Sequence, residues 1–177
     1  MIFMNDLSAP PTVPISADSP YASMLGIRMQ PGEFLDSKSQ DPTDLLETKA
    51  VQSSLPTFVL PFNKKNIGNI FLPALHGGAI AGFLQQAMVC HLNHLCAADS
   101  ATLPIRMIDF SIDYLRAGRE ATLYAQCEVQ RKGRRLVSIT ANAWHNPGRK
   151  VAIARGQFLF SDAEHDEERG ILFPVRT

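Results

Sequence analysis

Hydrophobic and polar residues follow two different periods along this chain of 177 residues. In the first pattern, one stripe of mainly apolar side chains recurs every three or four positions, as on one face of a helix. The stripe consists of Ile80, Phe83, Leu84, Ala87, Met88, His91, Leu92 and Leu95. After Pro104 the period changes to two, which is typical of half-buried strands. The pattern therefore predicts one long helix followed by strands.

Four runs with a period of two follow the helix, at residues 108–114, 122–130, 137–143 and 151–160. In the first of them, the side chains expected to face inward are Ile108, Phe110, Ile112 and Tyr114. Short turns containing glycine separate the runs, so we predict an antiparallel meander. An apolar helix can bury its stripe by lying against one face of such a sheet. This predicts an α+β domain in which a curved antiparallel sheet wraps around one long central helix.

The segment before the long helix is less regular. Residues 1–19 are rich in Pro, Ser and Asp and predict a flexible N-terminal arm. The stretch "SPYASMLGIRM" predicts a short helix with Ser19 as N-cap and Pro20 at its first position. Residues 31–56 predict a long loop insertion, and "TFVLPFN" after it predicts a strand.

The domain organisation follows from these segments. We expect a single domain over residues 20–162, because the length suits one hydrophobic core. Residues 163–177 combine an acidic block with an apolar end and predict a solvated C-terminal tail.

Composition and charge narrow the class of protein. Seventeen basic and seventeen acidic residues cancel, so we expect neither nucleic acid nor a membrane surface as a partner. The three cysteines fall in predicted helix or strand, and the N-terminus does not resemble a signal peptide. Both features predict a soluble, cytoplasmic protein.

The helix also carries "CHLNHLC", with Cys90, His91, His94 and Cys96. The two cysteines point away from the face that the histidines share, which disfavours a tetrahedral metal site. Core packing is the favoured interpretation, and no metal is predicted.

The start of the long helix, "LHGG", holds the most informative candidates for chemistry. Glycine lets a ligand approach the backbone closely, and the N–H groups of a first helical turn carry the positive end of the helix dipole. Gly77 and Gly78 therefore lie where a polarised carbonyl oxygen could be held. The alternative is a tight turn that requires glycine.

Five motifs occur in a fixed order: "IGN", "LHGG", "DYLR", "GRRL" and "ARGQF". In this order the chain resembles the hotdog-fold thioesterases, and in particular the phenylacetate-pathway type of acyl-CoA thioesterase, over residues 57–160. The resemblance implies a hotdog fold and hydrolysis of an acyl-coenzyme A, with no cofactor apart from the coenzyme A of the substrate. It also implies a homodimer or a dimer of dimers.

The resemblance further assigns roles to residues. It implies that the amides of Gly77 and Gly78 bind the thioester carbonyl, that His76 shapes the turn, and that Asn69 of "IGN" orients the substrate. Nine residues after this histidine the family carries an Asp or Glu, which activates water or attacks the thioester. Here that position is Gln85.

Gln85 leaves alternatives open. An amide is neither a base nor a nucleophile at neutral pH, whereas a carboxylate can be either. Gln85 could still hold a water or the substrate, or Gln85 and Gln86 could face a polar dimer seam. The first hypothesis is therefore an acyl-CoA thioesterase, and the second is a non-catalytic acyl-CoA-binding protein. A hotdog dehydratase is disfavoured because it requires the same missing carboxylate.

Cations for the phosphates of coenzyme A are the last candidates. The resemblance implies this role for Arg116 of "DYLR" together with the basic turn "RKGRR", which contains Arg131, Lys132, Arg134 and Arg135. The alternative for the basic turn is a solvated hairpin.

Overall fold

A computed structural model describes residues 13–14, 19–30, 55–69, 71, 73–98 and 105–160. The predicted insertion up to residue 54, the predicted tail and most of the predicted arm lie outside the described residues. The helices are α1 (Pro20–Leu25), the 3₁₀ helix η1 (Lys64–Asn66) and α3 (Gly77–Ala98). The strands are β1 (Val13–Pro14), β2 (Arg28–Gln30), β3 (Thr57–Leu60), β4 (Ile67–Asn69), β5 (Ala74–Leu75), β6 (Ile105–Tyr114), β7 (Leu123–Lys132), β8 (Leu136–Trp144) and β9 (Lys150–Phe160).

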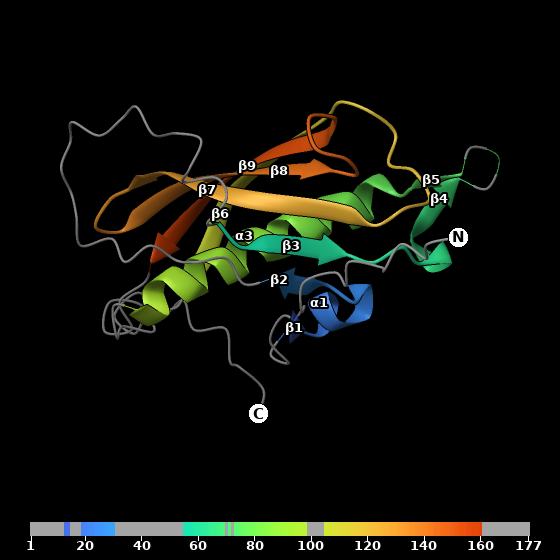
Figure 1. Cartoon of the computed structure of the whole chain (residues 1–177). Coiled ribbons are helices and arrows are strands. Elements are labelled where there is room, and N and C mark those ends of the chain that lie inside the picture. The colour runs from blue at the N-terminus through green and yellow to red at the C-terminus, as the bar shows by residue number, and fades with distance from the viewer. Residues whose placement is uncertain are drawn as a thin grey trace, which may run out of the picture.

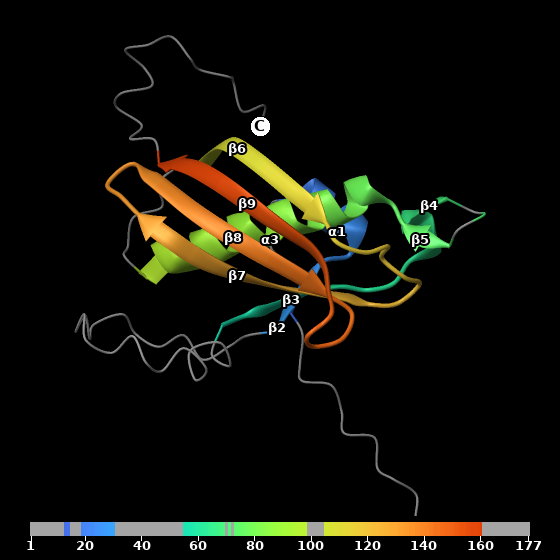
Figure 2. The same cartoon turned by 90° about the horizontal axis from the view of Figure 1, so that it is seen from above.

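Seven of these strands form one antiparallel sheet in the order β1-β2-β3-β7-β8-β9-β6, and β4 pairs with β5 separately. The long helix α3 lies along one face of this sheet (Figure 1). From above, the long strands β6 to β9 cover α3, and the β4–β5 pair lies beside its start (Figure 2). The predicted α+β arrangement, a sheet around one long helix, is confirmed. Val13 and Pro14, from the predicted arm, pair with β2 at the edge of the sheet.

The predicted four-stranded meander is wrong at its first strand. Strands β7, β8 and β9 follow one another as hairpins, but β6 pairs with β9, and β3 occupies the place beside β7. The physical reason lies in the connections. Residues 133–135 and 145–149 are short turns, whereas residues 115–122 are long enough for the chain to cross the end of the sheet.

Strand β6 also departs from its predicted alternation. The pairing with β9 shifts register between Met107 and Asp109, which marks a bulge. A bulge inserts one residue into the strand, so Ile108 turns outward and is 53% exposed, while Phe110 stays against the core. Tyr114, also predicted to face inward, is 50% exposed.

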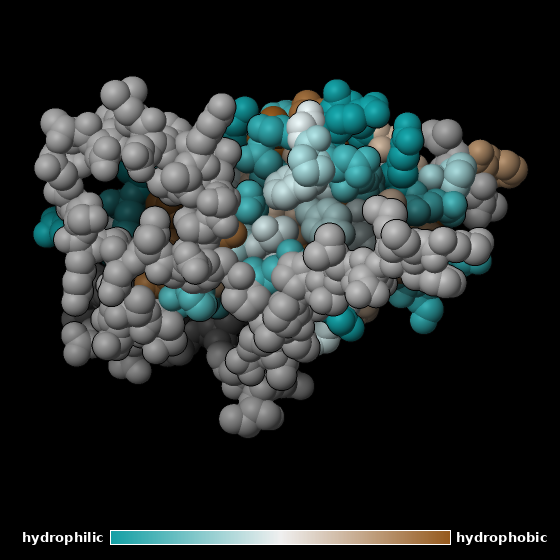
Figure 3. Space-filling model, viewed as in Figure 1, coloured by the Kyte–Doolittle hydropathy of each residue, from teal (hydrophilic) through white to brown (hydrophobic). Residues whose placement is uncertain are grey.

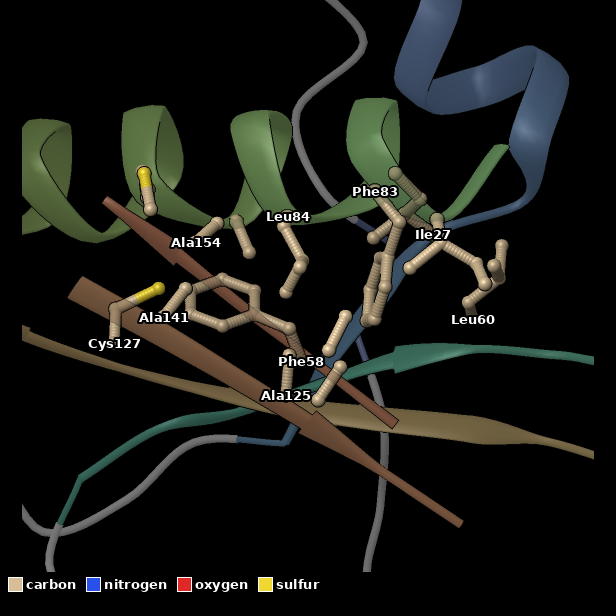
Figure 4. Packing of buried hydrophobic residues seen from close by; sticks show 14 of the residues in the cluster. Ile27, Phe58, Leu60, Phe83, Leu84, Ala125, Cys127, Ala141 and Ala154 are labelled. Atoms are coloured by element: carbon tan, nitrogen blue, oxygen red, sulfur yellow. The ribbon is translucent and has the colours of Figure 1, made fainter. Parts of the chain in front are cut away.

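The core lies between α3 and the sheet (Figure 4). The predicted helical stripe is buried from Ile80 to Leu92, with Phe83, Leu84, Ala87 and Met88 all 0% exposed, and is half-buried at Leu95. The sheet face that packs against α3 combines large side chains such as Phe58 and Phe158 with a group of small ones, which includes Ala125, Cys127, Ala141, Ala143 and Ala154. Small residues let a helix approach a sheet closely at native packing density. The outer surface over the long strands is mainly hydrophilic where the described residues are visible (Figure 3).

Helix α1 is capped as predicted and is tied to α3. The Ser19 hydroxyl accepts a hydrogen bond from the Ala22 N–H at 3.3 Å, and Pro20 begins the helix. The same hydroxyl donates to Gln86 Oε1 at 2.8 Å. In the part of the chain that is described, no helix is long and apolar enough to cross a membrane.

Gly156 in β9 provides a test of this packing. An added Cβ would lie 2.7 Å from Phe158 Cε2 and 2.9 Å from Met88 Sδ. Phe158 and Met88 are both 0% exposed, so neither can move aside easily. We expect Gly156→Ala to lower the free energy of unfolding by about 2 kcal/mol, as overpacked cores do. Urea unfolding measures this, with Gln157→Ala, at an exposed neighbouring position, as the control. An equal loss in both variants would contradict the packing argument.

Candidate functional site

The first turn of α3 is held from two sides. The His76 N–H donates to Asn66 O at 2.7 Å, and the Leu75 N–H donates to Gly118 O at 2.8 Å. The His76 carbonyl in turn accepts from the N–H groups of Ala79 and Ile80 at 2.9 and 3.1 Å. The position of this helix terminus is therefore set by η1 and by the loop that follows β6.

The two glycine amides of "LHGG" have different environments. The Gly78 N–H donates to His76 Nδ1 at 2.9 Å, so it is occupied. Because Nδ1 accepts, the ring proton of this neutral histidine is on Nε2. The described residues provide no acceptor for the Gly77 N–H, which lies at the positive end of the helix. Of the two predicted donors, Gly77 is therefore the one available to a ligand in this geometry.

Tyr114 holds the carbonyl side of the same residue. Its hydroxyl donates to Gly77 O at 2.7 Å, and a Cβ added to Gly77 would lie 3.2 Å from Tyr114 Oη. Desolvation raises the pKa of Tyr114, so the phenol remains a donor at neutral pH. The sequence placed Tyr114 only in the "DYLR" motif and in a strand. Its contact with Gly77 depends on the pairing of β6 with β9, which alternation alone does not reveal.

The "IGN" motif contacts the "LHGG" motif through its glycine. A Cβ on Gly68 would lie 2.8 Å from His76 Cα, which is a backbone atom. Glycine is therefore required for β4 to lie against the start of α3. The side chain of Asn69 lies outside the described residues, so its predicted role in orienting the substrate stays a prediction.

Gln85 and Gln86 point in different directions around α3, and a hydrogen-bond partner from another element is observed for Gln86. Gln86 receives the hydrogen bond from Ser19, so it joins α3 to α1. Gln85 is half-buried and points about 100° away around the helix. Along the axis, Gln85 lies about 12 Å from Gly77, at 1.5 Å per residue. One chain therefore does not bring Gly77 and Gln85 onto the same small group.

The predicted phosphate-binding cations are also separated. Arg116 follows Tyr114, at the end of the sheet where Tyr114 pairs with Ala152. The basic turn lies at the opposite end, beyond the pair Lys132 and Val137. This turn, at the left in Figure 1, is far from the start of α3 beside β5. Within one chain, Arg116 and the residues Arg131, Lys132, Arg134 and Arg135 do not form one site.

The histidine and cysteine segment of α3 is partly buried. His91 is 2% exposed, and burial, with a smaller effect from His94, lowers its pKa to about 4. Burial raises the pKa of the Cys90 thiol to about 11. Among the described residues, no group of three or more His, Cys, Asp or Glu side chains is arranged to hold a metal ion.

A family model, that of the thioesterase superfamily, matches residues 72–152 of the chain. A comparison with curated proteins finds no match. A protein of known structure from Chromobacterium violaceum is 32% identical, with a TM-score of 0.52, and the match covers 81% of this chain and 85% of that chain.

Two further solved structures share the fold at lower identity. The E. coli PaaI protein from the phenylacetic acid degradation operon is 20% identical, with a TM-score of 0.52, over 61% of this chain and 73% of that chain. A hypothetical thioesterase from Streptococcus pneumoniae, solved with coenzyme A, is 20% identical, with a TM-score of 0.51, over 60% of this chain and 77% of that chain.

Proposed function

This chain belongs to the thioesterase superfamily and has its hotdog fold, and from that premise we propose that it hydrolyses the thioester bond of an acyl-coenzyme A. The observation that carries the proposal is the start of α3, where the Gly77 N–H faces no acceptor among the described residues. The coenzyme A bound by the pneumococcal neighbour supports the choice of substrate class.

In the proposed reaction, the Gly77 N–H and the helix dipole polarise the thioester carbonyl and stabilise the oxyanion that forms. Water attacks the carbonyl carbon, and the carbon–sulfur bond breaks. The coenzyme A thiolate leaves and takes up a proton, and the acyl group leaves as a carboxylic acid. Apart from the coenzyme A of the substrate, this reaction requires no cofactor.

In this reaction Gln85 orients the attacking water. It can do so only in a homodimer, where two chains contribute to one site. Catalytic groups must lie within about 3.5 Å of the reacting atoms, whereas about 12 Å of helix separates Gly77 from Gln85. We therefore place the reaction between Gly77 of one protomer and Gln85 of the partner subunit. A dimer of dimers is compatible with the same arrangement.

The edge strand β6 supports a pairing of two chains. Among the described strands, β6 pairs only with β9, so its outer edge presents unpaired backbone groups. Large apolar side chains, Ile108, Tyr114 and Leu115, are each about half-exposed on or beside this strand. A second copy would cover both features.

We therefore expect the protein to be a dimer or a larger oligomer in solution at the concentration used in the assay. Light scattering measures its mass, and a monomer would contradict the dimeric site.

A second candidate function is acyl-CoA binding without turnover. Gln85 favours it, since the amide cannot accept the proton of an attacking water. The substrate contacts would then be the same, and the chemical step would be absent.

An assay of thiol release separates the two functions. We expect the purified protein to release coenzyme A from acetyl-, phenylacetyl- or long-chain acyl-CoA. The second function predicts saturable binding of the same compounds, measured by calorimetry, with release no faster than in a blank without protein. A protein that neither hydrolyses nor binds any of them would overturn both.

A further inference from the structure

A hollow of about 190 Å³ lies beside the end of the sheet where β6 finishes and β9 begins. Its walls come from two connections, residues 115–122 and residues 145–149. Three arginines line it, Arg116, Arg119 and Arg149, together with His145 and Asn146. Arg119 and Arg149 belong to no motif that the sequence pattern singled out.

His145 holds the two walls together. Its Nε2 accepts the N–H of Arg119 at 2.9 Å, and its Nδ1 lies 2.9 Å from Thr122 O. With Nε2 as acceptor, Nδ1 carries the proton and donates to Thr122 O. A single neutral imidazole therefore fixes the loop that carries Arg119 against the strand end that precedes Arg149.

The backbone sets the positions of the other two arginines. Arg149 closes a turn in which its N–H donates to Asn146 O at 3.1 Å, with Pro147 and Gly148 at the central positions. Gly148 has φ 79°, as the third residue of a type II turn requires. Arg116 Nη1 donates to Lys150 O at 2.6 Å, which brings this guanidinium toward the same turn.

The charge of the hollow is unbalanced. Within the described residues, no carboxylate forms an ion pair with Arg116, Arg119 or Arg149; the ion pair that joins neighbouring strands is between Arg155 and Asp113. Three like charges around one hollow repel each other, and an anion with several oxygens relieves that repulsion. Guanidinium groups match the oxygens of a phosphate in pairs.

The hollow is joined to the start of α3. Gly118 lies between Ala117 and Arg119, which both line the hollow, and its carbonyl accepts the Leu75 N–H at 2.8 Å. A Cβ on Gly118 would lie 3.1 Å from both Leu75 Cβ and Ile80 Cδ1, so glycine permits this contact. The same loop thus connects the arginines to the helix terminus that carries Gly77.

We infer that Arg116, Arg119 and Arg149 form a phosphate-binding site, positioned by His145, that holds a phosphate of coenzyme A. The identity of the phosphate as part of coenzyme A rests on the proposed function; the binding of a phosphate group does not. This site replaces the basic turn at residues 131–135 as the place where the anionic end of the substrate is held.

Calorimetry with three ligands tests the inference: coenzyme A, pantetheine, which has no phosphate, and inorganic pyrophosphate. We expect Arg119→Ala/Arg149→Ala to weaken binding of coenzyme A and pyrophosphate by at least about tenfold and to leave pantetheine unaffected. The comparison variant is Arg134→Ala/Arg135→Ala, which removes the same charge at the far end of the sheet. We expect it to change these affinities much less, and circular dichroism verifies that each variant is folded.

The outcomes separate this inference from the proposed function. Pyrophosphate binding that is lost in Arg119→Ala/Arg149→Ala, without any binding of coenzyme A, would support the phosphate site and overturn the proposed function. Unchanged affinities in a folded Arg119→Ala/Arg149→Ala protein would overturn the phosphate site alone. An equal loss in Arg134→Ala/Arg135→Ala would also overturn it, because nonspecific charge would then explain the binding.

Discussion

Replacing Gln85 by glutamate is expected to raise the rate of acyl-CoA hydrolysis by about a hundredfold, the lower range for a positioned general base. A carboxylate at this position can accept a proton from the attacking water, which the amide cannot do. Gln85 is half-buried on α3 in the single chain, and in the proposed dimeric site the attacking water lies beside it, so the new charge keeps a hydrogen-bonding partner. Steady-state thiol release measures kcat and KM for the variant and the natural protein.

The neighbouring glutamine provides the matched control. Gln86→Glu adds the same charge one residue further along, about 100° around the helix. Its carboxylate can still accept the Ser19 hydroxyl, so the link between α1 and α3 is kept. We expect no rise in kcat for this variant. A folded Gln85→Glu protein whose kcat is unchanged or lower would show that residue 85 is not at the reaction centre.

The protein is expected to lose stability as the pH falls from 7 to 5, and His91 is the cause. Burial lowers the pKa of His91 to about 4 from the ordinary 6.5. Between these values the unfolded chain binds more protons than the folded chain, so stability is full above pH 6.5 and falls toward pH 4. The loss from this residue between pH 7 and pH 5 is about 2 kcal/mol, from the difference between the two pKa values.

Urea unfolding at both pH values measures this loss. His91→Leu replaces the imidazole by an apolar side chain of similar size, and we expect the difference between pH 7 and pH 5 to shrink by most of that amount. His94→Gln, at an exposed position three residues along, is expected to keep the difference. If His91→Leu retained the full pH dependence, another group would have to be responsible.

The start of α3 shows what a local sequence pattern can predict and what it cannot. That a helix begins at these glycines is confirmed, since Gly77 is the first residue of α3, whereas the anion site there stays a prediction. "LHGG" predicted an anion site at a helix start because glycine and exposed N–H groups are local properties of a few consecutive residues. The sequence did not reveal that His76 Nδ1 accepts the Gly78 N–H, which distinguishes the two glycines. Nor did it reveal Tyr114 as the partner of Gly77 O, since a hydroxyl 37 residues away in the chain is brought there by strand pairing.

The positions of the arginines also depend on contacts between segments that are distant in the sequence. The resemblance groups Arg116 with the basic turn, because both supply positive charge for the phosphates of coenzyme A. Their separation follows from the direction of β6 and β7, and the grouping of Arg116 with Arg119 and Arg149 follows from the turn at Gly148. The distribution of charged residues along a sequence does not reveal which loops lie side by side in the folded chain.

The sequence by itself determined the main elements of this protein: the helical stripe from Ile80, the four long strands after it and the cap at Ser19. It also placed an amide, not a carboxylate, at position 85. The elements depend on the period of neighbouring side chains and on hydrogen bonds within a few residues. Only the tertiary structure decided the strand order, the outward turn of Ile108, the role of Gln86 and the hollow lined by three arginines. Those features depend on which distant segments pack together, and that choice is made by the whole core rather than by any local pattern.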